Sequence, residues 1–338
     1  MPLAERALIA QIRRMAKKPV TAPNPDRHGG YSGRTIKSAI VQGIGDDCAV
    51  LKASAALDLL VTTDFSLEGI HFRRDWHSAE SVGHRCLTRG LSDIASMGGS
   101  PTAAFLSLAV PRSLHQRWVA AFFRGLLKLA NQYHVILAGG DTAESPDRIL
   151  ADIMVLGNVP KGRAILRSGA RPGDRVFVSG ELGGAATEIA RLRSGLGRAV
   201  SARGYIRHFD PQPRIELGKA LLRDRIATSM IDISDGLSTD LAHICEESRV
   251  GAEIIAASIP RARVGRPQRE VGLELALHGG EDYELLFTVR GAKRVPRKLA
   301  GVVLTEIGRV TSGRGILLRD VNGKPRKLAP RGWEHFRK

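Results

Sequence analysis

The chain has 338 residues, of which 43% are hydrophobic and 25% are charged, and its formal net charge is +17. This length predicts two domains, because a single hydrophobic core stops growing near ~250–300 residues. The apolar runs are too short to cross a bilayer. Three widely separated cysteines without CxxC spacing exclude a cysteine-based metal site and fit a cytoplasmic location.

The N-terminal residues 1–38 precede the first predicted domain. Residues 1–19 are amphipathic and rich in arginine, and the acidic Glu5 argues against a transit peptide, so we expect a first helix. Residues 17–38 combine Pro, Gly and Asn with basic side chains and show no periodicity. That composition predicts a mobile basic loop.

The first predicted domain covers residues 39–157. Apolar residues recur at helical spacing over 81–97 and Gly98-Gly99 follows them, which predicts a helix that ends there. A second amphipathic helix is expected over 115–134. Apolar runs predict two strands around a turn in 49–66, strands at 102–111 and 148–160, and a strand passing into a loop over 135–142.

The second predicted domain covers residues 158–338 and again mixes strands with helices. Its predicted elements are strands at 175–180, 227–236, 282–289 and 302–310, and helices at 183–195 and 237–248. Neither half shows regular βαβ spacing. The predicted fold class is therefore α/β built in α+β layers rather than a doubly wound sheet.

Acidic residues gather beside Gly, Ser or Thr in several short segments, which is unusual in so basic a chain. Nine acids form these segments: Asp46, Asp47, Asp64, Asp93, Asp141, Asp232, Asp235, Glu281 and Asp282. Carboxylates forced together repel one another unless a cation lies between them, and Mg²⁺ prefers carboxylates together with substrate phosphates. The sequence holds no P-loop and no kinase HRD or DFG motif, so it predicts magnesium–nucleotide chemistry of another type.

Each acid also has a purely structural interpretation. Asp235 fits a helix N-cap, and Asp93 lies four residues after Arg89, where an ordinary helical ion pair is available. Asp46 and Asp47 fit a hairpin turn. The repetition of one pattern at six places favours a shared metal site over six separate structural roles.

The excess of positive charge also raises the possibility of nucleic-acid binding. Aromatic residues make up only 5% of the chain, the Lys and Arg residues are dispersed, and no known nucleic-acid motif is present. Nucleic-acid binding is therefore the disfavoured alternative.

Eight short motifs, in their order and spacing, resemble the thiamine-monophosphate kinases. They are GIGDDCAVL, TTDFSLEGIHF, LSDIASMGGSP, LAGGDT, GRAILRSGARPGD, IDISDGLSTDL, GGEDYELLF and GWEHF, which together extend from Gly43 to Phe336. This family belongs to the superfamily of aminoimidazole-ribonucleotide synthetase, selenophosphate synthetase and a hydrogenase-maturation protein. GGEDYEL and GWEHF favour the thiamine branch.

The resemblance implies ATP-dependent phosphorylation of thiamine monophosphate to thiamine diphosphate. It implies an N-terminal α/β domain whose sheet pairs with that of a second subunit in a homodimer, and a C-terminal α/β domain. ATP and several Mg²⁺ ions are expected in the cleft between the domains. Transfer is expected to be direct and in line, without a phosphoenzyme, because the acceptor is already an ionised phosphate.

The same resemblance implies the site residues. The expected metal ligands are Asp47, Thr62, Thr63, Asp64, Asp93, Asp141, Asp232 and Asp235. The expected nucleotide contacts are Gly140, Asp141, Arg167 and Ser234, with Arg167 also stabilising the transition state, and the expected substrate contacts are His71, Glu281 and Trp333. The role of Asp46 stays open.

Other members of the superfamily are the nearest alternatives. Selenophosphate synthetase needs an early reactive Cys, whereas the first cysteine here is Cys48, and the hydrogenase-maturation protein needs a C-terminal cysteine, whereas this chain ends HFRK. Aminoimidazole-ribonucleotide synthetase lacks the GWEHF-like tail. The long basic segment 17–38 and the +17 charge depart from the family pattern and leave room for an added partner or a lid.

Overall fold

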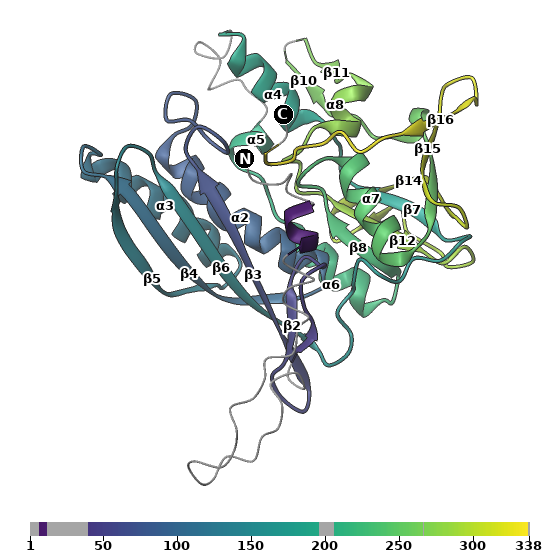
Figure 1. The fold of residues 1–338 in the computed structure, drawn as a ribbon, viewed down its shortest axis with the longest axis horizontal. Coiled ribbons are helices and arrows are strands. Elements are labelled where there is room, and N and C mark those ends of the chain that lie inside the picture. The colour runs from purple at the N-terminus through teal and green to yellow at the C-terminus, as the bar shows by residue number, and fades with distance from the viewer. Residues whose placement is uncertain (1–6, 12–39, 196–205, 266, 337–338) are drawn as a thin grey trace.

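The computed structural model describes residues 7–11, 40–195, 206–265 and 267–336 (Figure 1). Residues 7–11 are helical, as expected for the first helix, whereas the predicted loop over 17–38 lies outside the described residues. Among the described helices, none has the length and apolar character that crossing a membrane requires.

The N-terminal sheet contains six strands within the described residues, in the order β1-β2-β3-β6-β4-β5. Neighbours pair antiparallel except β4 and β5, which are parallel. The strands are β1 (Ile40–Gln42), β2 (Ala49–Lys52), β3 (Leu57–Leu67), β4 (Ser100–Pro111), β5 (Ile136–Ser145) and β6 (Leu150–Pro160). Buried and exposed residues alternate along β6, so one face of the sheet is covered.

The expected change from strand to loop within 135–142 is wrong, because β5 continues as a strand to Ser145. Gly139 and Gly140 pair with Phe105 and Leu106 of β4, and the parallel ladder carries the strand onward. A Cβ at Gly140 would lie 1.8 Å from the carbonyl oxygen of Leu106. The glycines therefore allow the two backbones to approach closely. In the sequence, glycines that serve this purpose look the same as glycines that form a turn.

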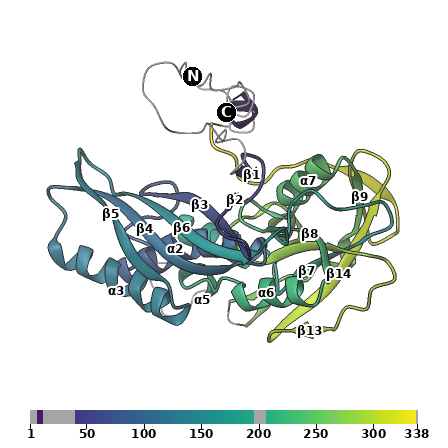
Figure 2. The same ribbon diagram turned by 90° about the horizontal axis from the view of Figure 1, so that it is seen from below.

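Helices α2 (Ala79–Ser96) and α3 (Gln116–Gln132) lie together on one face of this sheet (Figure 2). Ser78 is the N-cap of helix α2, and its hydroxyl accepts a hydrogen bond from the Ser81 N–H. The helix is buried along most of its length. The opposite sheet face exposes large apolar side chains of β3, β5 and β6. They include Phe65, Ile136, Leu150 and Met154.

Two glycines set the close approach of α2 and α3. A Cβ at Gly83 would lie 1.9 Å from the carbonyl oxygen of Phe122, and a Cβ at Gly125 would lie 1.9 Å from that of Glu80. We expect Gly83→Ala to lower the melting temperature by about 5 °C or more, because the helices must separate. Helix propensity alone predicts the opposite sign.

The matched control for this substitution is Gly272→Ala. A Cβ at Gly272 would meet nothing within 4 Å, and its φ is −62°. The melting temperature of this variant should stay within about 1 °C of the wild type. A Gly83→Ala protein as stable as this control would show that the two helices do not cross as described.

The C-terminal domain has its own mixed sheet, ordered β16-β15-β9-β14-β7-β12-β8 with β13 paired to β14 among the described residues. Its strands are β7 (Arg175–Ser179), β8 (Ala227–Asp232), β9 (Gly251–Ile255), β12 (Leu285–Val289), β13 (Lys298–Leu299), β14 (Val302–Thr311), β15 (Gly315–Arg319) and β16 (Pro325–Leu328), and β10 (Arg263–Val264) pairs separately with β11 (Arg269–Glu270). The helical segments are α4 (Gly184–Arg193), α5 (Ile206–Phe209), α6 (Ile215–Arg223), α7 (Leu237–Ser248), η3 (Ala256–Ser258) and α8 (Leu273–His278). Two mixed α/β domains with separate sheets are thus confirmed, while the division at residues 157/158 stays a prediction.

One apolar core joins the two domains. The buried cluster around α2 and the N-terminal sheet continues through Leu217 and Leu221 of α6 to Phe177 and Phe287 of the C-terminal sheet. The last two rings stack with their centroids 5.6 Å apart. Because this packing is continuous across the two domains, side chains from both can converge on one site.

Candidate active site

Carboxylates distant in sequence meet where the two domains join. Asp47 follows β1, Asp93 lies on α2 and Asp232 ends β8, and one carboxylate oxygen from each lies within 4.8 Å of the others. They line a cavity of about 340 Å³. The predicted ligands Thr62, Thr63, Asp64 and Asp235 line the same cavity.

Each central carboxylate accepts a hydrogen bond from a nearby hydroxyl. Ser92 donates to Asp232 at 2.6 Å, Ser96 donates to Asp47, and Thr62 donates to Asp93. These hydroxyls leave further lone pairs of each carboxylate available for another partner. Helix α2 thus orients acids from two other parts of the chain, and Thr62 of β3 orients the acid that α2 itself carries.

The acid cluster carries an electrostatic penalty without a cation. Burial, and then the neighbouring Asp47, raise the pKa of Asp232 to about 8. Burial, followed by Asp64 and Asp232, raises the pKa of Asp93 well above its usual value. The pKa of Asp64 is also raised by burial, despite the nearby Arg89.

Arg167 is a second cation that the structure places against these acids. Its Nε donates to Asp47 at 2.8 Å, and its backbone N–H donates to Asp46 at 3.1 Å. Burial, and then Asp47, raise the pKa of Asp46 to about 7. The Asp46 carboxylate thus positions the Arg167 backbone, which gives this acid a structural role.

The donor set fits magnesium. Most of the polar groups that line the shared space are carboxylate or hydroxyl oxygens, and the cations Arg89 and Arg167 line it as well. Hard divalent cations take oxygen ligands, and a cation between the acids removes their mutual repulsion.

Three predicted residues are placed differently from the central acids. Thr63 lines the cavity but is exposed, and strand alternation turns its side chain to the face opposite Thr62 and Asp64. Gly140 and Asp141 lie on the edge strand β5, outside this cavity. A single chain therefore does not bring them to the other expected ligands.

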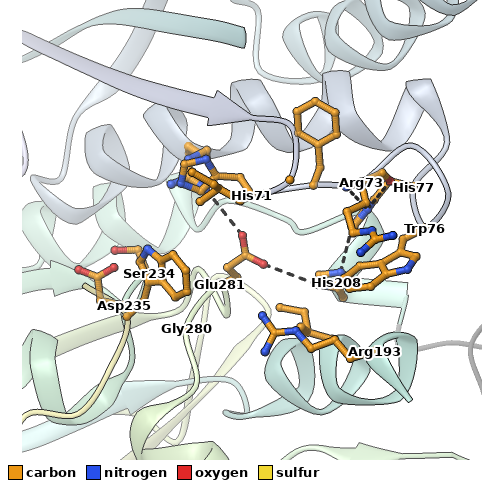
Figure 3. A pocket seen from close by; sticks show the side chains of 16 residues that line it. His71, Arg73, Trp76, His77, Arg193, His208, Ser234, Asp235, Gly280 and Glu281 are labelled. Atoms are coloured by element: carbon orange, nitrogen blue, oxygen red, sulfur yellow. Dashed lines mark hydrogen bonds and ion pairs between the residues drawn. The ribbon is translucent and has the colours of Figure 1, made fainter. Parts of the chain in front are cut away.

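A second cavity of about 320 Å³ adjoins the first and contains the predicted substrate residues His71, Glu281 and Trp333. Figure 3 shows the Glu281 carboxylate projecting into it between His71 and His208. Burial, and then the charge of Arg89, lower the pKa of His71 to about 3. Its Nδ1 accepts a hydrogen bond from the Leu67 N–H at 3.0 Å, so the neutral ring presents an N–H at Nε2.

Trp333 reaches this cavity because the C-terminal segment returns to the domain junction. Its backbone N–H donates to the carbonyl of Asp235 at 3.0 Å, and 47% of the residue is exposed. The His335 ring lies edge-on between Trp333 and His71, with centroid distances of 5.7 and 5.4 Å. The exposed indole face suits stacking with an aromatic ligand.

Sequence reasoning missed two arginines of α2. Arg85 donates to Glu281 at 2.7 Å, and Arg89 approaches Asp64 at 3.4 Å and Glu281 at 3.7 Å. The suggested helical ion pair between Arg89 and Asp93 is not present among the described residues. The four-residue spacing of Arg85 and Arg89 was a usable signal, because it places both on the helix face that carries Asp93.

The structure also decides the structural alternative for Asp235. Gly236 is the N-cap of helix α7, so Asp235 is not. Asp282 accepts a hydrogen bond from the Gly183 N–H at 2.7 Å, before α4, and lies outside both cavities.

Comparison with known proteins identifies the family. Residues 45–159 and 171–320 match the models of the AIR synthase related protein, N-terminal and C-terminal domains. Thiamine-monophosphate kinase of Escherichia coli strain K12 is 39% identical over 312 residues, covering 90% of this chain and 94% of the relative. The chain belongs to the thiamine-monophosphate kinase family. The Bacillus subtilis strain 168 member is 35% identical, with coverage of 90% and 96%.

A solved structure of the family matches the whole architecture. The structure described as AaThiL complexed with AMPPCP and TMP is 30% identical and superposes with a TM-score of 0.80 over 99% of both chains. With this agreement, the present chain is an enzyme of the family, a thiamine-phosphate kinase.

Proposed function

We propose that the enzyme transfers the γ-phosphoryl group of ATP directly to the phosphate of thiamine monophosphate. An acceptor phosphate oxygen forms a bond to the γ-phosphorus as the bond from that phosphorus to the β–γ bridging oxygen breaks, which yields thiamine diphosphate and ADP. The main support is the junction of an acid-lined cavity with an aromatic one, which share His71, Arg89, Ser234, Asp235 and Trp333. In AaThiL, AMPPCP and TMP bind to one protein of this fold.

The proposed ligand contacts follow the two cavities. Magnesium is assigned to Asp47, Asp93 and Asp232, with Thr62, Thr63, Asp64, Asp141 and Asp235 completing the set. Bound magnesium supplies charge neutralisation to the phosphates. Gly140, Asp141, Arg167 and Ser234 are assigned to the nucleotide, and His71, Glu281 and Trp333 to thiamine monophosphate.

No protein nucleophile or strong general base is required. The second pKa of a phosphate monoester is near ~6, so the acceptor oxygen is already ionised at neutral pH. Cys48, the cysteine nearest the acids, is buried, and burial raises the pKa of its thiol well above the usual value. The enzyme's own contribution is to align two anions and to hold Arg167 beside the transferring group.

A side-by-side assay tests this function. The purified enzyme with ATP and Mg²⁺ should form ADP stoichiometrically with thiamine diphosphate from thiamine monophosphate, and should form no product from thiamine. Turnover of an aminoimidazole precursor instead would assign the chain to another branch of the superfamily. Magnesium-independent, salt-sensitive binding of nucleic acid without kinase turnover would support the nucleic-acid alternative.

We infer that the working enzyme is a homodimer. The uncovered face of the N-terminal sheet exposes Phe65, Ile136 and Met154, and β5 is an exposed edge strand of ten residues. Such edges and apolar faces are normally covered by a partner. A second copy on this face also offers a route for Gly140 and Asp141 to reach the other subunit's acids.

Mixing two inactive variants tests this arrangement. Asp141→Asn and Asp232→Asn should each be inactive alone, and co-expression should restore about a quarter of wild-type activity, since half of random dimers carry one intact site. Differently tagged subunits verify that mixed dimers form. Verified mixed dimers without activity would contradict a site shared between subunits.

A further inference from the structure

Arg89 lies at the boundary between the two cavities. It projects from the middle of α2 and lines both the acid cavity and the aromatic cavity. Its side chain is 16% exposed, so ligand atoms in either cavity can reach it. The other residues common to both cavities are His71, Ser234, Asp235 and Trp333.

Arg89 is the one positively charged residue that both cavities share among the described residues. Arg167 lines only the acid cavity, Arg193 lines only the aromatic cavity, and His71 is neutral. Burial alone would lower the pKa of Arg89. Tyr283, Asp64 and Glu281 outweigh it and hold the pKa above its usual value. A permanent positive charge therefore lies at the boundary.

The hydrogen-bonding capacity of Arg89 is only partly used. Nη1 donates to the Tyr283 hydroxyl at 3.2 Å, while Nε lies 3.4 Å from Asp64 and Nη1 lies 3.7 Å from Glu281. Nη2 has no hydrogen-bond partner among the described residues. A guanidinium carries five N–H donors arranged as a fork that suits phosphate.

Arg85, one helical turn earlier, shows the contrasting arrangement. Its Nη1 donates to the carbonyl of His208, its Nη2 donates to Glu281 at 2.7 Å, and it lines neither cavity. The Arg85 side chain is therefore buried and links the two domains through its hydrogen bonds. The loosely held Arg89 beside it is available to a ligand.

Given the proposed function, we propose that Arg89 binds the phosphate group of thiamine monophosphate and holds the attacking oxygen between the two cavities. The acceptor phosphate must lie where the aromatic cavity, which takes the thiamine rings, meets the acid cavity, which takes the triphosphate. That boundary is otherwise acidic, with Asp64, Asp235 and Glu281 close by. An uncompensated phosphate dianion would be repelled there, and Arg89 removes that repulsion.

Comparing two ligands separates phosphate binding from general support of the pocket. Affinities for thiamine monophosphate and for thiamine are measured by calorimetry with Mg²⁺ and AMPPCP present, so that no turnover occurs. The wild type should prefer the phosphorylated ligand. Arg89→Met should reduce this preference by about 10- to 100-fold through weaker binding of thiamine monophosphate, with thiamine affinity unchanged.

Two further variants complete the test. Arg89→Lys keeps the charge but loses the fork, so its preference should be intermediate. Arg193→Met removes the same charge from the aromatic cavity alone and should change both affinities by the same factor. If Arg89→Met also weakens both ligands equally, Arg89 only supports the pocket and the proposal is wrong.

Failure of this proposal is distinguishable from failure of the proposed function. Wild-type turnover of thiamine monophosphate tests the reaction, whereas the affinity ratio tests Arg89. A wild type that turns over this substrate while Arg89→Met retains the full preference would overturn the Arg89 assignment alone. A wild type without a preference for the phosphorylated ligand would also overturn the Arg89 assignment, whereas a wild type that does not turn over thiamine monophosphate would overturn the proposed function.

Discussion

Replacing Asp232 by Asn is expected to lower kcat by about 1000-fold or more while the protein stays folded. Of the three acids at the centre of the cluster, Asp232 alone comes from the C-terminal domain. Its neutral replacement has nearly the same shape and can still accept the hydrogen bond from Ser92. The lost activity would therefore report the lost charge rather than a lost fold.

The same substitution should stabilise the metal-free protein at alkaline pH. Burial raises the pKa of Asp232 to about 8 in the folded protein. The contribution of this carboxyl group to the stability of the fold is therefore fully present below its ordinary pKa and is lost as the pH rises through about 8. Asn does not titrate. In EDTA, the melting temperature of Asp232→Asn should exceed that of the wild type at pH 8.5, and the difference should shrink towards pH 6.

Asp58→Asn provides the matched control. Asp58 is also a buried carboxylate and accepts a hydrogen bond from the Gly162 N–H at 2.8 Å, but it lies outside both cavities. Folded Asp58→Asn protein should retain near-native kcat. An Asp232→Asn enzyme with near-native kcat would remove this residue from the proposed ligand set.

Replacing Arg167 by Gln is expected to lower kcat/KM for ATP by about 100-fold or more. Arg167 is held by Asp46 through its backbone and contacts Asp47 through its guanidinium, so its charge is fixed beside the acids before ligands bind. Preorganised charge of this kind acts most strongly on the negative charge that develops during phosphoryl transfer.

Arg167→Lys separates charge from geometry. Lysine keeps the positive charge but cannot reproduce the planar fork, so its activity should fall between the wild type and Arg167→Gln. Steady-state kinetics at saturating thiamine monophosphate measure both variants. Equal kcat/KM for ATP in Arg167→Gln and the wild type would exclude a role for Arg167 in nucleotide chemistry.

Local patterns in the sequence predicted the long elements well. The apolar spacing over 81–97 corresponds to α2, and the apolar run at 102–111 corresponds to β4, because apolar residues recur at helical spacing in α2 and buried residues alternate along β4. The prediction ended strand β5 too early. The close packing of backbones at Gly140 requires a glycine, and glycine is also the residue that is typical of a turn.

The site was less accessible to local reasoning. The order of the motifs indicated which acids belong to the expected site. Spacing alone suggested that Arg89 pairs with Asp93. Its observed partners, Asp64 and Glu281, lie far away in sequence. Likewise, Ser92 and Ser96 orient acids from other elements. Such contacts depend on how the domains pack, which no periodicity encodes.

The central claim is that Asp47, Asp93 and Asp232 hold metal against the triphosphate of ATP. A crystal structure with Mn²⁺ and AMPPCP, with anomalous scattering data collected at the manganese edge, tests it most directly. We predict anomalous peaks within coordination distance of these carboxylates and of the analogue's phosphates. Manganese bound only to the phosphates or to surface acids, with the three carboxylates unligated, would contradict the account.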